Sequence, residues 1–128
     1  MFYIIILAMF VPTLTFNETL QEESIGYRTI TAYNAVKEQT DNTPCIGALK
    51  GIDFCNHKIP IVATNEMPLG SLVKISDTIY LVADRTNRRY KYRYDILFRS
   101  EKDALEFGRQ TLLVSKIQSK VNNNLTTQ

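Results

Sequence analysis

The sequence has no tryptophan, one histidine and only two cysteines, and each scarcity narrows what the protein can be. Cys45, Cys55 and His57 follow the spacing Cys-x9-Cys-x-His, which lacks the fourth ligand and the close pairing of a structural zinc site. We therefore expect no metal ion. In an exported chain an even number of cysteines favours a disulfide that closes a short loop, and the spacing alone leaves two free thiols open.

A strong excess of positive or of negative charge is also missing. Fifteen Lys and Arg residues stand against thirteen Asp and Glu residues, which leaves a formal net charge of +2. This mild balance argues against a protein dedicated to nucleic acids or to membrane surfaces. With 128 residues the chain is long enough for one ordinary domain and too short for two. Seven Tyr and six Phe favour strands, because aromatic rings pack well on a pleated surface.

A long hydrophobic run is absent as well. Residues 1–16 are almost wholly apolar, but only about a dozen strongly hydrophobic residues precede Pro12, and a spanning helix needs roughly 20. This length is typical of a secretory signal and predicts export to the periplasm or cell envelope. The run lacks a preceding Lys or Arg and an Ala-x-Ala cleavage site, so two alternatives stay open. These are a membrane anchor through residues 2–16 and a buried N-terminal strand.

A linker, a mainly β domain and a polar tail are expected to follow, over residues 17–26, 27–117 and 118–128. Segments rich in β-branched and aromatic residues, separated by Gly, Pro and Asp turn signals, predict six strands. The strands are expected at 27–34, 60–64, 71–76, 78–84, 90–99 and 109–116. Several short strands with one brief helix predict a small barrel.

The helix has clear signals at both ends. Ser100 followed three residues later by Asp103 resembles a capping box, and Gly108 suits the position just after a helix over 101–107. Between the first two strands, residues 35–58 hold both cysteines and are expected to form a long loop, which the cysteines can staple.

The segment 84–99, with the sequence DRTNRRYKYRYDILFR, holds the candidate functional residues. Side chains alternate across a strand, so one face is expected to carry apolar residues and the other Lys91, Arg93 and Asp95. The apolar face would hold Tyr90, Tyr92, Tyr94, Ile96 and Phe98. Three interpretations follow: a solvated strand whose charges neutralise one another, a substrate groove with Asp95 as a catalytic acid, or a nucleic-acid surface. The third is disfavoured, since alternation places the rings away from the cations.

A series of short motifs occurs in order from about residue 29 to residue 114. They are Thr31-Ala32-Tyr33, Met67-Pro68-Leu69-Gly70, Asp84, Asp95-Ile96-Leu97-Phe98, Ala104 and Phe107-Gly108-Arg109. In this order and spacing the chain resembles the 3D domain of cell-wall lytic transglycosylases. The resemblance implies a six-stranded double-psi β-barrel with one short helix, and cleavage of the MurNAc–GlcNAc bond of peptidoglycan strands.

The resemblance also implies roles for particular residues. Asp95 resembles the catalytic acid, and Asp84 resembles its supporting partner. In this reaction the acid protonates the glycosidic oxygen and the C6 hydroxyl of the muramoyl sugar attacks, so a 1,6-anhydro product forms without a metal or cofactor. Thr31 and Tyr33 share one strand face and are expected to line the groove, although Tyr33 is equally suited to packing in the core.

Further residues are candidates for contact with the substrate. The family aspartate expected just before the Pro-Leu-Gly turn is absent, and Ala63-Thr64-Asn65-Glu66 is found there, where Glu66 either substitutes for it or is an ordinary turn residue. Arg85, Arg88 and Arg89 are candidates to meet carboxylates of the peptidoglycan stems, or are exposed turn residues that only add solubility, and Arg93 is a further candidate for substrate contact. The glycines that follow the middle aspartate in the family are also replaced, by Thr86-Asn87-Arg88. These departures leave open a different glycan, or a non-catalytic module that binds glycan or takes part in a cell-envelope complex.

Overall fold

The computed structural model of the protein describes residues 15–34, 45–56 and 58–124. The chain divides into two compact units, and the larger, Glu22–Gln118, contains the barrel. The smaller contains the described residues 15–21 and 119–124, which belong to the first and last strands. Most of the predicted export signal lies outside the described residues. Among those described, no helix is long and apolar enough to cross a membrane.

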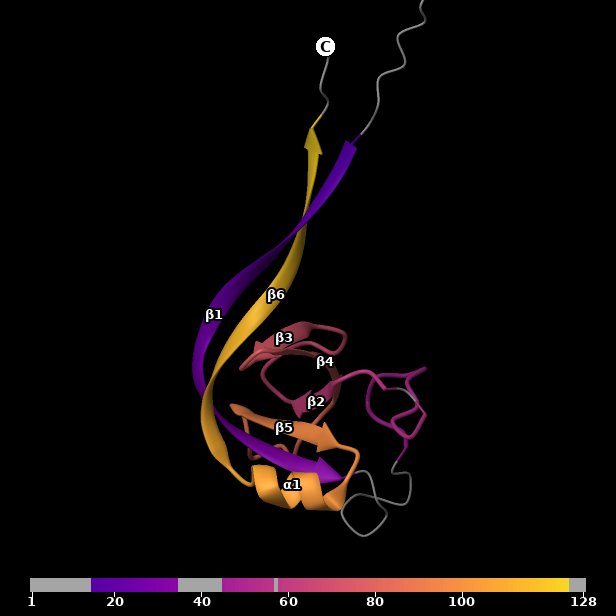
Figure 1. Ribbon diagram of the computed structural model, residues 1–128, viewed down its shortest axis with the longest axis vertical. Helices are drawn as coiled ribbons and strands as arrows, with labels where there is room; N and C mark the ends of the chain where they lie inside the picture. Colours follow the sequence, from indigo (N-terminus) through magenta and orange to yellow (C-terminus); the bar gives the residue numbers. More distant parts are fainter. Residues whose placement is uncertain (1–14, 35–44, 57, 125–128) are drawn as a thin grey trace, which may run out of the picture. The chain divides into compact units, whose positions relative to one another are not determined.

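Six strands close a barrel in the order β1-β5-β2-β4-β3-β6, which confirms the predicted mainly β fold with one short helix (Figure 1). The strands are β1 (Thr15–Asn34), β2 (Ile61–Thr64), β3 (Leu72–Ile75), β4 (Thr78–Asp84), β5 (Arg93–Phe98) and β6 (Gln110–Asn124). Two pairs are parallel, β1 with β5 and β2 with β4. The antiparallel pairing of β2 with β5 joins them.

The outer strands are longer than the sequence predicts. β1 begins at Thr15, so residues 17–26 lie inside a strand and not in a linker. β6 continues to Asn124 through most of the predicted polar tail. Residues 18–24 and 118–120 have exposed side chains. Backbone pairing needs no apolar face, and a polar strand exposed on both sides gives none of the alternation by which strands are detected.

The barrel interior is filled by buried side chains from all six strands. They are Ile30, Val62, Val73, Ile75, Val82, Tyr94, Ile96 and Val114, joined by Met67. A second apolar cluster contains Ile61, Ala83 and Leu97, which are chain neighbours of interior residues and therefore face outward. The barrel wall between β1 and β4 is thus packed on both faces.

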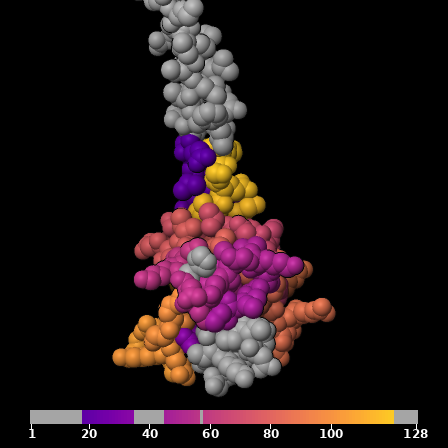
Figure 2. Space-filling model, turned by 90° about the vertical axis from the view of Figure 1, so that its right-hand side faces the viewer, coloured from indigo at the N-terminus to yellow at the C-terminus, as the bar shows by residue number. Residues whose placement is uncertain are grey.

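Residues 45–56, here called the disulfide lobe, cover this outward face. Figure 2 shows the lobe in magenta on one side of the barrel. Cys45 and Cys55 form a disulfide, which confirms the predicted pairing, and Phe54 is 1% exposed against the outer cluster. The N–H of Leu49 donates to the carbonyl of Ala83 at 2.9 Å. A side chain at Gly47 would collide with the ring of Phe54, so this close packing requires glycine.

The helix α1 (Glu101–Phe107) forms as its signals predict. The side chain of Ser100 accepts a hydrogen bond from the N–H of Asp103 at 3.3 Å, and Gly108 ends the helix with φ of 62°. Ala104 is buried, and the Phe107 ring lies 5.3 Å from that of Phe98. The helix therefore anchors the chain between β5 and β6.

Candidate functional site

A row of four residues crosses four neighbouring strands on the outer face of the barrel wall. Thr31 of β1 pairs with Asp95 of β5, and Asp95 pairs with Ala63 of β2. Ala63 in turn pairs with Asp84 of β4. Residues paired across strands share a face of the sheet, so the two aspartates that the sequence singled out flank one small alanine. We call these residues the acid row.

Asp84 reaches the row through a shift of register. Val62 pairs with Val82, but the next residue, Ala63, pairs with Asp84, so Ala83 is an extra residue in β4. By simple alternation Asp84 would share the face of Val82 and point into the barrel. The extra residue turns its carboxylate outward instead, which is a common use of a β-bulge.

Asp95 is held in a setting that favours its neutral form. The hydroxyl of Thr31 donates to Asp95 Oδ1 at 3.0 Å. Burial raises the pKa of Asp95, and the charge of Asp84 adds to the rise, while the Thr31 hydrogen bond and the charge of Arg93 oppose it. The pKa lies above the ordinary value for an aspartate. A carboxyl that stays protonated at higher pH is suited to donate a proton.

Asp84 is fixed by backbone donors. Its Oδ1 accepts from the N–H of Ala48 at 3.1 Å and from its own neighbour, the N–H of Arg85, at 2.9 Å. The first bond connects the row to the disulfide lobe. Because β2 lies between β4 and β5, the backbones at the two aspartates are two strand spacings apart, about 9–10 Å.

Tyr33 lies beside the row with an unused hydroxyl group. Its ring packs against the outer apolar cluster, and its buried Oη has no hydrogen-bond partner among the described residues. Burial raises the pKa of Tyr33, and the charges of Asp84 and Asp95 raise it further. The hydroxyl is therefore close to both carboxylates and stays protonated. The packed ring expected for Tyr33 agrees with this position, whereas a hydroxyl that lines a groove stays a prediction.

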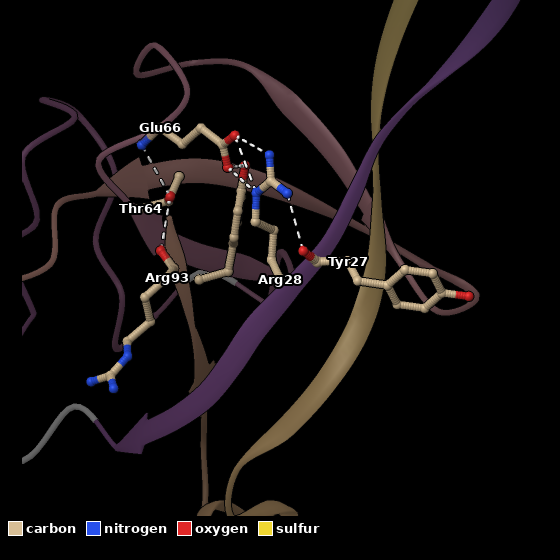
Figure 3. A network of polar contacts seen from close by, with 6 residues as sticks. Tyr27, Arg28, Thr64, Glu66 and Arg93 are labelled. Carbon is tan, nitrogen blue, oxygen red and sulfur yellow. Dashed lines mark hydrogen bonds and ion pairs between the residues drawn. The ribbon is translucent and has the colours of Figure 1, made fainter. Parts of the chain in front are cut away.

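Glu66 lies on the other side of β5. Its carboxylate accepts from Arg28 Nε at 3.0 Å and Nη2 at 2.8 Å, and from Tyr94 Oη at 2.8 Å (Figure 3). Burial alone would raise the pKa of Glu66, but these hydrogen bonds and the charge of Arg28 bring it below the ordinary value. Tyr94 points into the barrel, whereas Asp95 points out. Glu66 therefore does not join the acid row.

The side chain of Arg85 also makes its contacts away from the acid row. Its Nη1 donates to the carbonyls of Thr64 at 2.8 Å and Met67 at 2.5 Å, which ties the end of β4 to the turn after β2. Nearby, Nδ2 of Asn65 lies 2.9 Å from the carbonyl of Asn87 and 3.0 Å from that of Tyr90. These contacts hold residues 85–92 as an ordered loop.

Tyr90 and Tyr92, the two tyrosines of this loop, do not face the core as predicted. β5 begins only at Arg93, so alternation does not extend back to Tyr90 and Tyr92. Tyr92 is 54% exposed, and the Arg28 guanidinium and the Lys91 ammonium lie 5.4 Å from its ring centroid. The expectation that these rings pack in the core, away from the cations, is wrong. Tyr94 and Ile96, within β5, are buried as predicted.

The structure thus brings together four of the predicted site residues, Thr31, Tyr33, Asp84 and Asp95, with Arg93 two residues before Asp95 on the same face. It places Glu66 and Arg85 in separate networks. Ala63 and the N–H of Ala48 were not anticipated, because neither carries a side chain that signals chemistry. Searches against protein-family models, curated proteins and solved structures find no match to this chain.

Proposed function

We propose that the protein is an exported lytic transglycosylase that cleaves the MurNAc–GlcNAc bond of peptidoglycan on a double-psi β-barrel, with Asp95 as general acid and base. The acid row carries this proposal: a partly buried aspartate with a raised pKa accepts a hydrogen bond from Thr31 and shares its face with a second carboxylate, that of Asp84, two strands away. The two parallel strand pairs support the barrel type, and the disulfide is in keeping with an oxidising compartment.

Asp95 supplies both proton transfers of the reaction. The protonated carboxyl gives its proton to the glycosidic oxygen as the bond from that oxygen to C1 of the muramoyl sugar breaks. The resulting carboxylate takes the proton of the C6 hydroxyl as that oxygen bonds to C1, so the ring closes and Asp95 is protonated again. Positive charge develops on the sugar between these events, and the carboxylate of Asp84 is placed to stabilise it.

Digestion of purified peptidoglycan by the full chain tests the proposal. We expect mass spectrometry to find 1,6-anhydro muropeptides with the wild type and none with Asp95→Asn. Peptidoglycan left intact by a wild-type protein shown to be folded by circular dichroism would overturn it. Products carrying a free reducing end would also do so, because they would indicate hydrolysis.

A non-catalytic glycan-binding module is the second candidate. The charge of Arg93 and the hydrogen bond from Thr31 both favour ionised Asp95, and an ionised Asp95 can accept sugar hydroxyl groups but cannot donate a proton. Sedimentation of the protein with insoluble peptidoglycan, unchanged in Asp95→Asn and without soluble product from either form, would favour this module.

A further inference from the structure

Two positively charged side chains lie against the ring of Tyr90. The Arg93 Cζ lies 3.6 Å from the ring centroid, and the Arg89 Cζ lies 4.6 Å from it. Arg89 Nη2 also donates to Tyr90 Oη at 2.6 Å. A ring face attracts a guanidinium group, but two such groups at one ring repel each other.

No ion pair joins these cations to an acidic side chain in the part of the chain that the structure describes, although Arg93 lies near enough to Asp95 to lower its pKa. The ion pairs found there join Arg28, Lys74 and Lys102 to glutamates, and none involves Arg89, Lys91 or Arg93. Residues 85–94 contain five cations and no acidic residue. The contrast with Arg28, which sits on Tyr92 but is neutralised by Glu66, indicates that the group at Tyr90 is arranged for an external anion.

The position of the group connects it to the acid row. Arg93 of β5 pairs with Thr29 of β1, and the next outward-facing pair on the same two strands is Asp95 with Thr31. Two residues along a strand span about 7 Å. A groove of about 340 Å³ lies at this step, lined by Tyr27, Arg28, Thr29 and Tyr92. A polymer chain bound at Asp95 would therefore extend past Arg93 and Thr29.

We propose that Arg89, Tyr90 and Arg93, here called the Tyr90 clamp, form a subsite for a carboxylate carried by the glycan strand bound at Asp95. Guanidinium groups bind carboxylates through paired N–H donors, and stacking on a ring leaves donors at the guanidinium edge beyond the one that Arg89 gives to Tyr90 Oη. The proposal rests on the proposed function for the identity of the polymer only. Single-stranded nucleic acid fits less well, because Arg93 covers the Tyr90 face on which a base would stack.

Occupation of the clamp has a consequence for the acid. Asp95 faces the Thr31 hydroxyl from β1, Asp84 from β4 and Arg93 from its own strand, and the charge of Arg93 lowers its pKa. A carboxylate bound to Arg93 offsets that charge, so the pKa of Asp95 rises when such a substrate binds. The substrate itself then helps to keep the acid protonated.

Binding to the full chain carrying Asp95→Asn, which prevents turnover, tests the clamp by NMR. The probe is a disaccharide-peptide fragment of peptidoglycan, compared with the same fragment after its carboxylates are converted to amides. We expect the amide form to bind about tenfold more weakly, and the Nε–Hε signals of Arg89 and Arg93 to shift only with the carboxylate form. Equal affinities would overturn the proposal. So would tighter binding of inorganic phosphate or of an oligothymidylate than of the carboxylate form.

Matched variants separate the clamp from general attraction by positive charge. Arg89→Gln and Arg93→Gln are expected to abolish the preference for the carboxylate form, whereas Arg88→Gln, which removes the same charge from the same loop, is expected to keep it. Equal losses in all three variants would overturn the clamp. If the preference holds but wild-type protein releases no anhydro product, the proposed function fails and the clamp stands. If wild-type protein releases anhydro product but shows no preference for the carboxylate form, the clamp fails and the proposed function stands.

Discussion

Asp95 and Glu66 are two partly buried carboxyl groups on opposite faces of the same barrel wall, and their surroundings move their pKa values in opposite directions. Glu66 receives hydrogen bonds from Arg28 and Tyr94 and has a lowered pKa. Asp95 receives one from Thr31 and has a raised pKa. Burial disfavours the charged form at both sites. At Glu66 the donors Arg28 and Tyr94 outweigh it, whereas at Asp95 burial and the charge of Asp84 outweigh the Thr31 hydrogen bond and the charge of Arg93.

This difference separates a structural role from a chemical one. A carboxylate that is neutralised and fully bonded stabilises the fold and has little left to offer a ligand. The acid row instead combines a carboxyl that resists ionisation with a second carboxylate, and beside it lies the Tyr33 hydroxyl, which has no hydrogen-bond partner among the described residues. Groups with perturbed pKa values cluster at functional sites.

The largest effect expected is on catalysis. Asp95→Asn and Glu66→Gln make the same chemical change, from acid to amide, at the two sites. We expect the first to lower the rate of anhydro-muropeptide release by about 10²–10⁴-fold, because proton transfer is lost, and the second to leave it within a few-fold per folded molecule. Comparable losses in both would remove the distinction between the sites.

The next largest effect is expected from removing the disulfide of the disulfide lobe, which covers the outer face of the barrel wall. Cys45→Ala combined with Cys55→Ala is expected to lower the free energy of unfolding by about 2–3 kcal/mol, because a loop closed over a sequence separation of 10 is released in the unfolded chain. Urea denaturation measures the change. Wild-type protein with its disulfide reduced provides the control, and a difference between the two forms would point to lost packing at the cysteines.

Glu66→Gln is expected to lower the free energy of unfolding by about 1–3 kcal/mol at neutral pH, since Arg28 loses its counter-charge. The pKa of Glu66 is lowered by folding, so its contribution is present above the ordinary value of about 4.3 and is lost as pH falls through the folded value. The loss in the variant therefore shrinks on acidification. Glu106→Gln, at an exposed helix pair, is the control and is expected to change little.

Asp95→Asn is expected to show the opposite pH dependence. The folded pKa of Asp95 is raised, so its ionisation opposes folding. The cost is absent at low pH and grows as pH rises through the ordinary value of about 3.9 toward the folded value. The variant therefore gains stability relative to wild type as pH rises. Urea denaturation from pH 3 to 7 measures how the stability difference between each variant and the wild type changes with pH. A change of the same sign for Asp95→Asn and Glu66→Gln would contradict the assigned pKa directions.

The smallest effect expected is that of Tyr33→Phe on stability. Its hydroxyl has no partner among the described residues, so its removal is expected to change the free energy of unfolding by less than about 1 kcal/mol, or to raise it. A loss of glycan affinity or of cleavage rate without loss of stability would assign the hydroxyl to the ligand. A destabilised variant would show instead that the hydroxyl serves the fold.

Much of the fold could be predicted because its signals are local. The helix was located by Ser100 and Gly108, and the bounds of β4 by its apolar residues between two turn signals. The polar ends of β1 and β6 were not predicted, because their pairing uses backbone groups that every sequence has. Alternation was correct for Tyr94 and Ile96 but was carried too far, to Tyr90 and Tyr92 in the preceding loop.

The candidate site was predictable in its chemical groups but not in its geometry. The resemblance to a known family singled out Asp84 and Asp95, and strand pairing places both on the acid row. No sequence pattern announces that Ala83 is an extra residue in β4, since a register shift depends on the partner strand. Likewise, the capture of Glu66 by Arg28 joins residues 38 positions apart and lies beyond any local pattern.

The way the acid row is assembled has a consequence for when the proposed reaction becomes possible. Its members come from four neighbouring strands, and Thr31 and Asp95 are 64 positions apart, so only the pairing of these strands assembles it. In the unfolded chain Asp95 is a solvated carboxyl with an ordinary pKa near 4. A newly made chain would therefore lack the raised-pKa carboxyl that the proposed reaction requires, and this group would form only where the four strands pair.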